Sequence, residues 1–325
     1  MPTFSVIVPN FNHAAYLAQR LESIRTQEFQ DFELLILDDA STDGSREVIE
    51  RFQGDPRVRV EWNARNSGSP FCQWNRGLRE ARGEYVWIAE SDDWADTRFL
   101  GRMLERLRAN PRAVLAYSQS WRVDAAGQIL GSMKAHTDPV DAHHWSSDFT
   151  ADGKAEVSKY FLQLDPIPNA SAVVVKRSAM ISVGPAREEL KLMGDWLMWA
   201  AVLAQGDLEF IAEPLNYFRQ HPGTVRAGMA HGARELEETY LVLGWIAARY
   251  PLDAGLVENM RGVLFRRWCE WMSMPDGWKE LEPHRRIHAR ARVFDPDVNL
   301  RLARAFPGLA WRKLLPPGTP GHGAA

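Results

Sequence analysis

Short apolar runs alternate with helix-like segments through the first third of the chain. The runs are rich in β-branched and aromatic residues, and the segments between them place apolar residues at helical spacing. Strands are predicted at Phe4–Val8, Phe32–Leu37, Val58–Trp62 and from Tyr85, with helices at Asn12–Gln27, Ser45–Phe52 and Cys72–Ala81. Strands that alternate with helices in this way form βαβ units. The sequence therefore predicts an α/β fold with a Rossmann-like, mainly parallel sheet flanked by helices.

The composition fits a globular protein and argues against some partners. Hydrophobic residues make up 45% of the 325 residues, which is enough for one large core or two. A formal net charge of −3 gives no reason to expect nucleic acid as a partner. Two distant cysteines, Cys72 and Cys269, offer neither a disulfide framework nor a zinc cluster. No signal-peptide pattern follows Met1, and no apolar stretch approaches about 18 residues, so we expect a cytoplasmic protein.

The pattern changes in the last third of the chain. From Arg234 onward it is helical, and the tail that begins with Pro316 is rich in glycine and proline. We therefore predict an α/β domain over residues 1–228, a helical C-terminal extension over 229–315 and a disordered tail over 316–325. Basic and apolar residues combine in Arg285–Arg292 and Leu309–Leu315, a pattern of segments that lie on anionic membranes or pack on a neighbouring domain.

An acidic cluster ends the strand that begins at Tyr85. Glu90, Asp92 and Asp93 place three carboxylates within four positions, with no basic residue among them. A hard divalent cation with oxygen ligands would neutralise such a cluster. A second reading is a solvated acidic turn that caps the helix starting near Trp94. The motif alone leaves both readings open.

Polar residues also follow other strands or open a helix. Pro9–Asn12 follows the first strand, Asp38 and Asp39 follow the second, and Asp195 opens a helix after Gly194. Ligands of open α/β sheets bind outside the carboxyl ends of the strands. These groups are therefore expected to converge on one ligand.

The order of these motifs resembles that of family 2 glycosyltransferases of the GT-A fold. The resemblance covers about residues 3–225 and rests on Pro9–Asn12, Leu34–Ser45, Asn66–Gly68, Arg82–Tyr85 and Glu90–Asp93. It implies a nucleotide-sugar donor, with Mg or Mn as cofactor, and inversion at the anomeric carbon. It also implies that Asp195 is the catalytic base, that Asp93 is the metal ligand and that Asp92 lies near the ribose.

The same resemblance implies a donor pocket. Asp39 would accept a hydrogen bond from the nucleobase, and Arg219 and His221 would lie near the diphosphate. The full set of expected donor-binding residues is Pro9, Asn10, Asn12, Asp39, Asn66, Asn75, Asp92, Arg219 and His221.

Two departures from the family pattern concern this site. An arginine expected near the donor is displaced at Gln73–Arg76, and Arg76 and Arg65 are candidates to replace it. Gly194 stands where a second acid usually lies beside the base. The catalytic prediction therefore depends on Asp195 alone.

We thus predict a metal-dependent inverting glycosyltransferase that uses a UDP- or dTDP-sugar. Its acceptor would be a hydroxyl of a glycan or lipid-linked molecule in bacterial surface polysaccharide or lipopolysaccharide synthesis. Peripheral contact at the inner face of the plasma membrane is one of the two readings that the basic C-terminal segments leave open. A nucleotidyltransferase is the enzyme alternative, although Pro9–Asn12 replaces its usual glycine-rich, basic phosphate loop. The second alternative is a non-catalytic glycan- or partner-binding protein. The presence of both Asp93 and Asp195 argues against this alternative.

Overall fold

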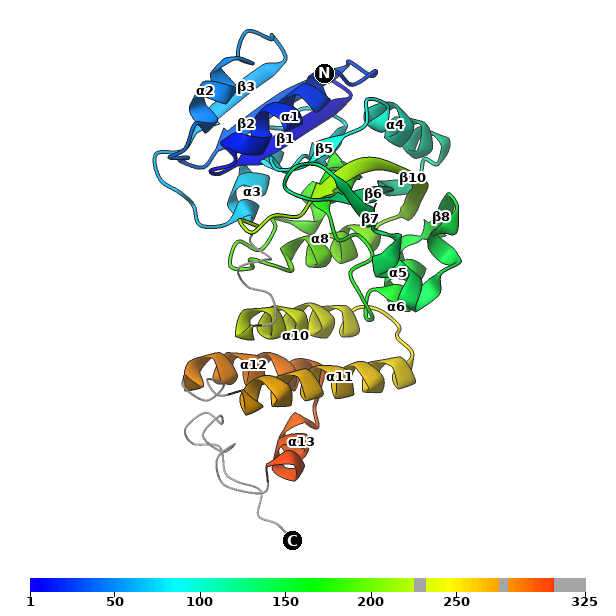
Figure 1. Ribbon diagram of the computed structural model, residues 1–325. Coiled ribbons are helices and arrows are strands. Elements are labelled where there is room, and N and C mark those ends of the chain that lie inside the picture. Colours follow the sequence, from blue (N-terminus) through cyan, green and yellow to red (C-terminus); the bar gives the residue numbers. More distant parts are fainter. Residues whose placement is uncertain (225–231, 275–279, 307–325) are drawn as a thin grey trace. The chain divides into compact units, whose positions relative to one another are not determined.

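The computed structural model describes residues 1–224, 232–274 and 280–306 (Figure 1). Contacts within the chain define two compact units, Met1–Thr224 and Val225–Ala325. The predicted domain boundary at residue 228, the basic and apolar segment Leu309–Leu315 and the predicted tail lie outside the described residues.

A ten-stranded sheet forms the centre of the first unit, in the order β3-β2-β1-β4-β9-β6-β10-β5, with β7 beside β6 and β8 beside β10. Its strands are β1 (Phe4–Asn10), β2 (Phe32–Asp38), β3 (Val58–Trp62), β4 (Tyr85–Ile88), β5 (Trp94–Ala95), β6 (Ala113–Val123), β7 (Ile129–Ser132), β8 (Phe149–Asp152), β9 (Val173–Lys176) and β10 (Asp207–Arg219). The predicted parallel arrangement is confirmed for β1 to β4. Beyond β4 the sheet is mixed, because β9 runs antiparallel to both β4 and β6.

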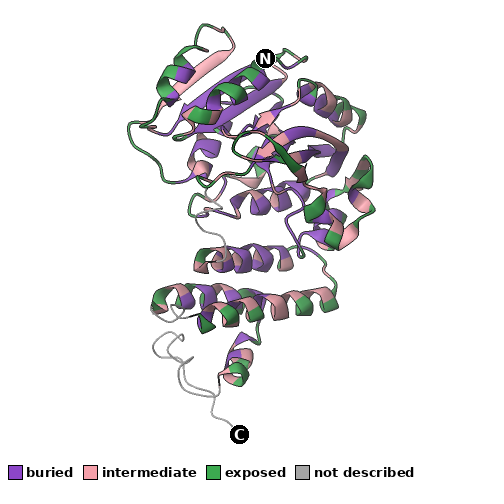
Figure 2. Ribbon diagram, viewed as in Figure 1, coloured by how far each residue is buried: buried purple, intermediate pink, exposed green. Residues whose placement is uncertain are grey.

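Helices cover both faces of this sheet. They are α1 (Ala14–Arg25), α2 (Ser45–Glu50), α3 (Pro70–Glu80), α4 (Phe99–Ala109), α5 (Lys134–Asp141), α6 (Gly153–Tyr160), α7 (Arg177–Val183) and α8 (Gly194–Leu203), with short 3-10 turns η1 (His144–Ser146) and η2 (Ala170–Ala172). Val6 and Val8 of β1 share a core with Leu17 and Leu21 of α1, whereas Ile7 faces α3. Every residue of β1 is therefore buried, as Figure 2 shows by colour.

The strand register brings the carboxyl ends of three strands to one edge of the sheet. Asn10 at the end of β1 pairs with Asp38 at the end of β2, and Ile7 pairs with Ile88 at the end of β4. The chain turns sharply after β1 and β2, where Asn12 and Ala40 have φ angles of 56° and 63°. The residues that follow these strands therefore lie along the same edge.

The described part of the second unit is helical, which confirms the predicted helical extension. Its helices are α10 (Ala233–Ala247), α11 (Ala254–Ser273), α12 (Leu281–Phe294) and α13 (Val298–Ala305). Their shared core contains the buried side chains of Tyr240, Trp268 and Phe294. Among the described residues of the chain, no helix combines the length and apolar character that a membrane crossing needs.

Candidate active site

Two histidines and an aspartate meet beside the acidic strand end. His13 follows β1, Asp92 follows β4 and His221 follows β10. His221 Nε2 lies 3.0 Å from Asp92 Oδ2, and the two imidazole rings are 5.6 Å apart. One nitrogen of each histidine and one oxygen of Asp92 lie within 4.8 Å of one another. This cluster has the donor atoms and spacing of a divalent cation site.

The charges in this cluster suit a cation. Burial favours the neutral form of Asp92, but the hydrogen bond with His221 and the nearby His13 outweigh it and hold the pKa of Asp92 below its ordinary value. Burial lowers the pKa of His13, although the charge of Asp92 opposes this effect. His13 Nδ1 also lies 2.8 Å from the hydroxyl of Ser91, which orients its ring. A neutral imidazole beside an ionised carboxylate is ready to bind a metal ion.

Sequence reasoning missed His13. Its signal was its place directly after Pro9–Asn12, at the edge where the other strand ends gather. The sequence did not indicate that a histidine 78 residues before Ser91 would meet the acidic turn.

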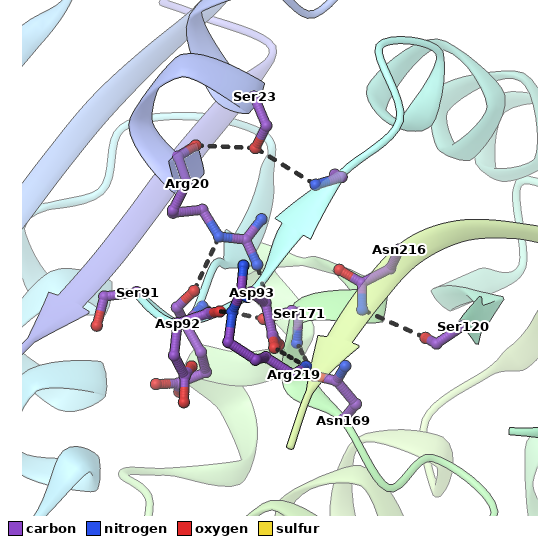
Figure 3. Close-up of polar contacts among 12 residues, drawn as sticks. Arg20, Ser23, Ser91, Asp92, Asp93, Ser120, Asn169, Ser171, Asn216 and Arg219 are labelled. Carbon is purple, nitrogen blue, oxygen red and sulfur yellow. Dashed lines mark hydrogen bonds and ion pairs between the residues drawn. The ribbon is translucent and has the colours of Figure 1, made fainter. Parts of the chain in front are cut away.

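Asp93 has a different environment from that of Asp92 (Figure 3). It is only 2% exposed and accepts a hydrogen bond of 2.8 Å from the backbone N–H of Arg219. The guanidinium of Arg20, which is also buried, lies 4.0 Å from its other oxygen. Burial and the charge of Asp92 raise the pKa of Asp93. Asp93, the expected metal ligand, is thus held inside the protein, and it is Asp92 that lies beside the two histidines.

Glu90 anchors the acidic turn after β4 through two hydrogen bonds. Its carboxylate accepts a hydrogen bond of 2.9 Å from the indole N–H of Trp74, and its carbonyl accepts one of 2.8 Å from Arg20. Burial and the charge of Asp92 raise the pKa of Glu90 to about 8. The ring of Trp74 lies 5.8 Å from that of Trp199 in α8. Trp74 therefore connects the acidic strand end with the helix that carries Asp195.

Asp195 occupies the first turn of α8, where the positive end of the helix dipole favours a carboxylate. Its Oδ1 accepts a hydrogen bond of 2.8 Å from the backbone N–H of Trp196. A Cβ atom on Gly194 would lie 2.4 Å from the ring of Phe71. Close packing of α8 on Phe71 is therefore the reason for glycine at the position where the family pattern has a second acid.

Asp39 is buried in a network of its own chain. It is 4% exposed, and its two oxygens accept hydrogen bonds from Asn63, from Gln73 and from both the N–H and the hydroxyl of Ser67. A carboxylate has about four acceptor positions, so these bonds use its capacity. Asp39 orders the loop between β3 and α3, and its expected role as acceptor for the base is a prediction that this network does not favour.

Asn10 and Asn12 join the loops that follow β1 and β2. The amide of Asn10 donates to Asp38 over 2.8 Å, and the side-chain oxygen of Asn12 accepts from the backbone of Thr42 over 2.7 Å. Pro9 lies inside β1, paired with Leu37. These residues shape the sheet edge at which the donor is expected.

The remaining two asparagines of the predicted donor set differ in their surroundings. Asn66 is exposed, and its side-chain oxygen accepts from Gly68 over 2.7 Å, which orders the tip of the loop before α3. Asn75 is buried, and its amide makes hydrogen bonds with the backbone of Ala186 and with Glu188. Asn75 therefore holds the segment that precedes α8.

Three arginines are candidates for the donor. Arg65 is exposed, and the other two, Arg219 and Arg76, are engaged elsewhere. Arg219 is 2% exposed, and all three nitrogens of its guanidinium donate to other residues of the chain. Arg76 donates to Glu61 over 2.6 Å and also contacts Asn63 and Glu80, which ties α3 to β3. Neither Arg219 nor Arg76 presents a free guanidinium to a donor phosphate.

Comparison with known sequences finds similarity to the same family that the motifs resemble. The family model described as glycosyl transferase family 2 matches residues 5–155. The chain is 35% identical over 102 residues to the poly(ribitol-phosphate) beta-N-acetylglucosaminyltransferase TarS of Staphylococcus aureus, covering 31% of this chain and 18% of TarS. It is 37% identical over 94 residues to the GalNAc(5)-diNAcBac-PP-undecaprenol beta-1,3-glucosyltransferase of Campylobacter jejuni, covering 29% of this chain and 30% of that protein. These matches thus span less than a third of each relative's length.

Solved structures extend the likeness to nearly the whole chain. The structure of S. aureus TarS residues 1–349 with UDP-GlcNAc aligns with a TM-score of 0.67 and 20% identity, covering 93% of this chain and 87% of that one. The mannosyltransferase PcManGT of Pyrobaculum calidifontis, in complex with GDP-Man and Mn2+, aligns with a TM-score of 0.57 and 17% identity, covering 96% and 84%. Residues 5–155 of this chain therefore match the family 2 glycosyltransferases, and the protein has the GT-A fold.

Proposed function

We propose that this protein is a metal-dependent, inverting glycosyltransferase that moves a sugar from a nucleotide-sugar donor to a hydroxyl of a glycan or lipid-linked acceptor. The observation that carries the proposal is the cluster of His13, Asp92 and His221 at the carboxyl edge of the β-strands of a GT-A fold. In α/β proteins this edge is where nucleotide ligands bind.

The donor that we propose is a UDP- or dTDP-sugar. Support comes from TarS, which was solved with UDP-GlcNAc and with UDP. The names of two relatives, a poly(ribitol-phosphate) transferase and a putative teichuronic acid biosynthesis enzyme, support an acceptor in surface polysaccharide synthesis. The proposed donor and acceptor thus depend on similarity to these relatives, and a panel of nucleotide sugars tests the nucleotide directly.

His13, Asp92 and His221 are the residues that would hold the cation. Magnesium prefers oxygen ligands and keeps several waters, whereas imidazole nitrogen suits transition metals better. Two imidazoles and one carboxylate therefore favour Mn2+ over Mg2+. A bound divalent cation neutralises the charge that develops on a departing diphosphate.

Asp195 is the proposed catalytic base. As the acceptor oxygen attacks the anomeric carbon, its proton passes to the Asp195 carboxylate, and the bond from that carbon to the nucleoside diphosphate breaks. A single displacement of this kind inverts the configuration at the anomeric carbon. A positioned general base contributes a factor of about 10² to 10⁴ to the rate.

The test is release of nucleoside diphosphate from a panel of nucleotide sugars, with Mn2+ or EDTA and a lipid-linked acceptor. We expect release with Mn2+, and none with EDTA. Asp195→Asn is expected to lower kcat by about 10² to 10⁴ with little change in donor affinity. Asp92→Asn is expected to weaken Mn2+ binding. Asp138→Asn, a half-exposed aspartate of α5 paired with Lys134, is the control and should leave both unchanged.

Other outcomes would support the alternatives. Pyrophosphate release from a nucleoside triphosphate would favour a nucleotidyltransferase. Absence of release with every donor, while a glycan still binds, would favour a non-catalytic binding protein. The configuration of the glycosidic bond in the product, measured by NMR, tests inversion separately, because retention of configuration would exclude the single displacement.

A further inference from the structure

Arg219 ends β10, two residues before His221, and its side chain is enclosed by the protein. Its Nε donates to the carbonyl of Asp92 over 2.7 Å. One terminal nitrogen donates to the carbonyl of Ala125 over 2.8 Å, and the other donates to the side chain of Gln19 over 2.6 Å. The guanidinium thus joins α1, the acidic turn after β4 and the turn after β6.

Aromatic rings cover the guanidinium plane. Its central carbon lies 4.6 Å from the ring centre of Tyr16 and 4.7 Å from that of Trp94. In the turn after β6, Gly127 has a φ of 89°, and a Cβ at this position would lie 3.4 Å from Trp94 and 3.9 Å from the guanidinium of Arg219. Guanidinium groups stack on aromatic faces while their N–H groups bond in the plane. Little of this cation is left for a phosphate.

The segment from Arg219 to His221 also binds the acidic turn through other atoms. The backbone N–H of Arg219 donates to Asp93 Oδ1 over 2.8 Å, and His221 Nε2 lies 3.0 Å from Asp92 Oδ2 (Figure 3 shows the Arg219 contacts). Antiparallel pairing of β10 with β5 continues the contact at Tyr217 and Trp94. The distance between Asp92 and His221, which are 129 residues apart in sequence, therefore depends on how this segment docks.

We propose that Arg219 is a positioning residue, which sets Asp92 and His221 at the spacing that a divalent cation requires and does not contact the donor diphosphate. This inference rests on the proposed function, because it assumes that these two side chains are metal ligands. Partners that orient metal ligands typically change metal affinity by about 10- to 100-fold when they are removed. A direct phosphate contact would instead act on nucleotide affinity.

The experiment compares Arg219→Met and Arg219→Lys with Arg122→Met in the 325-residue chain. Arg122 is exposed on β6, opposite Phe218 of β10, and is a matched control for loss of a guanidinium. Mn2+ affinity is measured from the EPR signal of free Mn2+, and UDP affinity is measured by calorimetry in EDTA. We expect about 10- to 100-fold weaker Mn2+ binding for Arg219→Met and unchanged UDP binding in EDTA.

The lysine variant separates geometry from charge. A lysine ammonium carries the same charge but lacks the planar fork that reaches three partners at once. We therefore expect Arg219→Lys to bind Mn2+ as weakly as Arg219→Met. Recovery of Mn2+ affinity by lysine, or a loss of UDP affinity in EDTA with Mn2+ affinity intact, would overturn the proposal.

A milder variant keeps the test informative if Arg219→Met does not fold. Gln19 is exposed and contributes one hydrogen bond to Arg219, so Gln19→Ala should fold normally and weaken Mn2+ binding by less than Arg219→Met does. Hydrogen exchange of residues 92–95 is measured in every variant and requires no metal. Faster exchange there in both Gln19→Ala and Arg219→Met than in Arg122→Met supports the positioning role. Unchanged exchange would overturn it.

Absence of Mn2+ binding by the unmodified protein would refute the metal site of the proposed function. The hydrogen-exchange result at residues 92–95 would still decide the positioning role of Arg219.

Discussion

At the scale of single residues, the surroundings of each carboxyl group decide its role. Glu90, Asp92 and Asp93 belong to one short motif, yet one accepts from an indole, one faces two histidines and one is enclosed between Arg20 and the backbone of Arg219. Burial raises the pKa values of the first and the third, whereas the histidines keep that of Asp92 low. The motif therefore supplies one partly buried carboxylate with a lowered pKa, which is the proposed metal ligand, and two acidic groups with raised pKa values that support it.

Glu33 allows a stability test of another buried carboxylate. Its side chain is 5% exposed and accepts hydrogen bonds from the hydroxyl of Ser5 and from the backbone and side chain of Arg82. Burial acts to raise its pKa, but these bonds outweigh burial and lower it. We expect Glu33→Gln to cost about 1.5–3 kcal/mol of unfolding free energy at pH 7, toward the lower end because Arg82 is 58% exposed.

The pH dependence of this cost has a defined sign. A carboxyl with a lowered folded pKa adds stability above its unfolded pKa of about 4.3, and that stability is lost as the pH falls through the folded pKa. The difference between the original protein and Glu33→Gln in urea unfolding should therefore shrink from pH 5 to pH 3. Glu105→Gln, which changes a 71% exposed side chain, is the control and should show little effect at any pH. A constant difference across this range would contradict the ionic role of Glu33.

At the scale of elements, close contact between α3 and β1 fixes the position of the loop around Asp39. Gly77 in α3 has no room for a side chain, because a Cβ there would lie 2.5 Å from Ile7 in β1. The same helix carries Trp74, which binds Glu90, and Gln73, which binds Asp39. The packing of α3 on β1 therefore fixes the positions of Trp74 and Gln73, and through them those of Glu90 and Asp39 at the sheet edge.

Two helical glycines provide a matched pair of substitutions. Gly77→Ala is expected to destabilise the protein by about 1–3 kcal/mol through overpacking against Ile7. Gly101 in α4 has nothing within 4 Å of an added Cβ, so Gly101→Ala is expected to stabilise by about 0.5–1 kcal/mol through helix propensity. Denaturant unfolding measures both. Equal effects of the two substitutions would show that α3 is free to move away from β1.

At the scale of the whole molecule, all the proposed site residues lie in one of the two compact units. His13, Asp92, Asp195 and His221 fall within Met1–Thr224, whose core runs through the ten-stranded sheet. The described helices of Val225–Ala325 have a separate core around Tyr240 and Trp268. The proposed metal ligands and the proposed catalytic base therefore all belong to the first unit.

This division leads to a prediction for a fragment. Residues 1–224 expressed alone are expected to fold and to bind Mn2+ as the 325-residue chain does, because both the core of the first unit and the proposed ligands lie inside that fragment. Circular dichroism and EPR titration check the two parts of the prediction. Loss of Mn2+ binding in a folded fragment would show that the helical unit contributes to the site.

The order and type of the elements up to β4 could be predicted from the sequence, because hydrophobic periodicity is a local property. The predicted strand Val58–Trp62 coincides with β3, and the predicted run Phe4–Val8 is two residues shorter than β1. The mixed part of the sheet could not be predicted in this way. A strand such as β9 carries no local signal that distinguishes antiparallel pairing with β4 and β6 from parallel pairing.

By itself the sequence determined the α/β fold, the helical C-terminal extension and the gathering of acidic residues at strand ends, since each depends on local periodicity and on the direction of parallel strands. Only the tertiary structure decided which carboxylate meets the histidines. His13, Asp92 and His221 approach through the packing of β1, β4 and β10, and Arg219 is enclosed by residues up to 200 positions away. Such contacts arise from long-range packing, which no local pattern in the chain encodes.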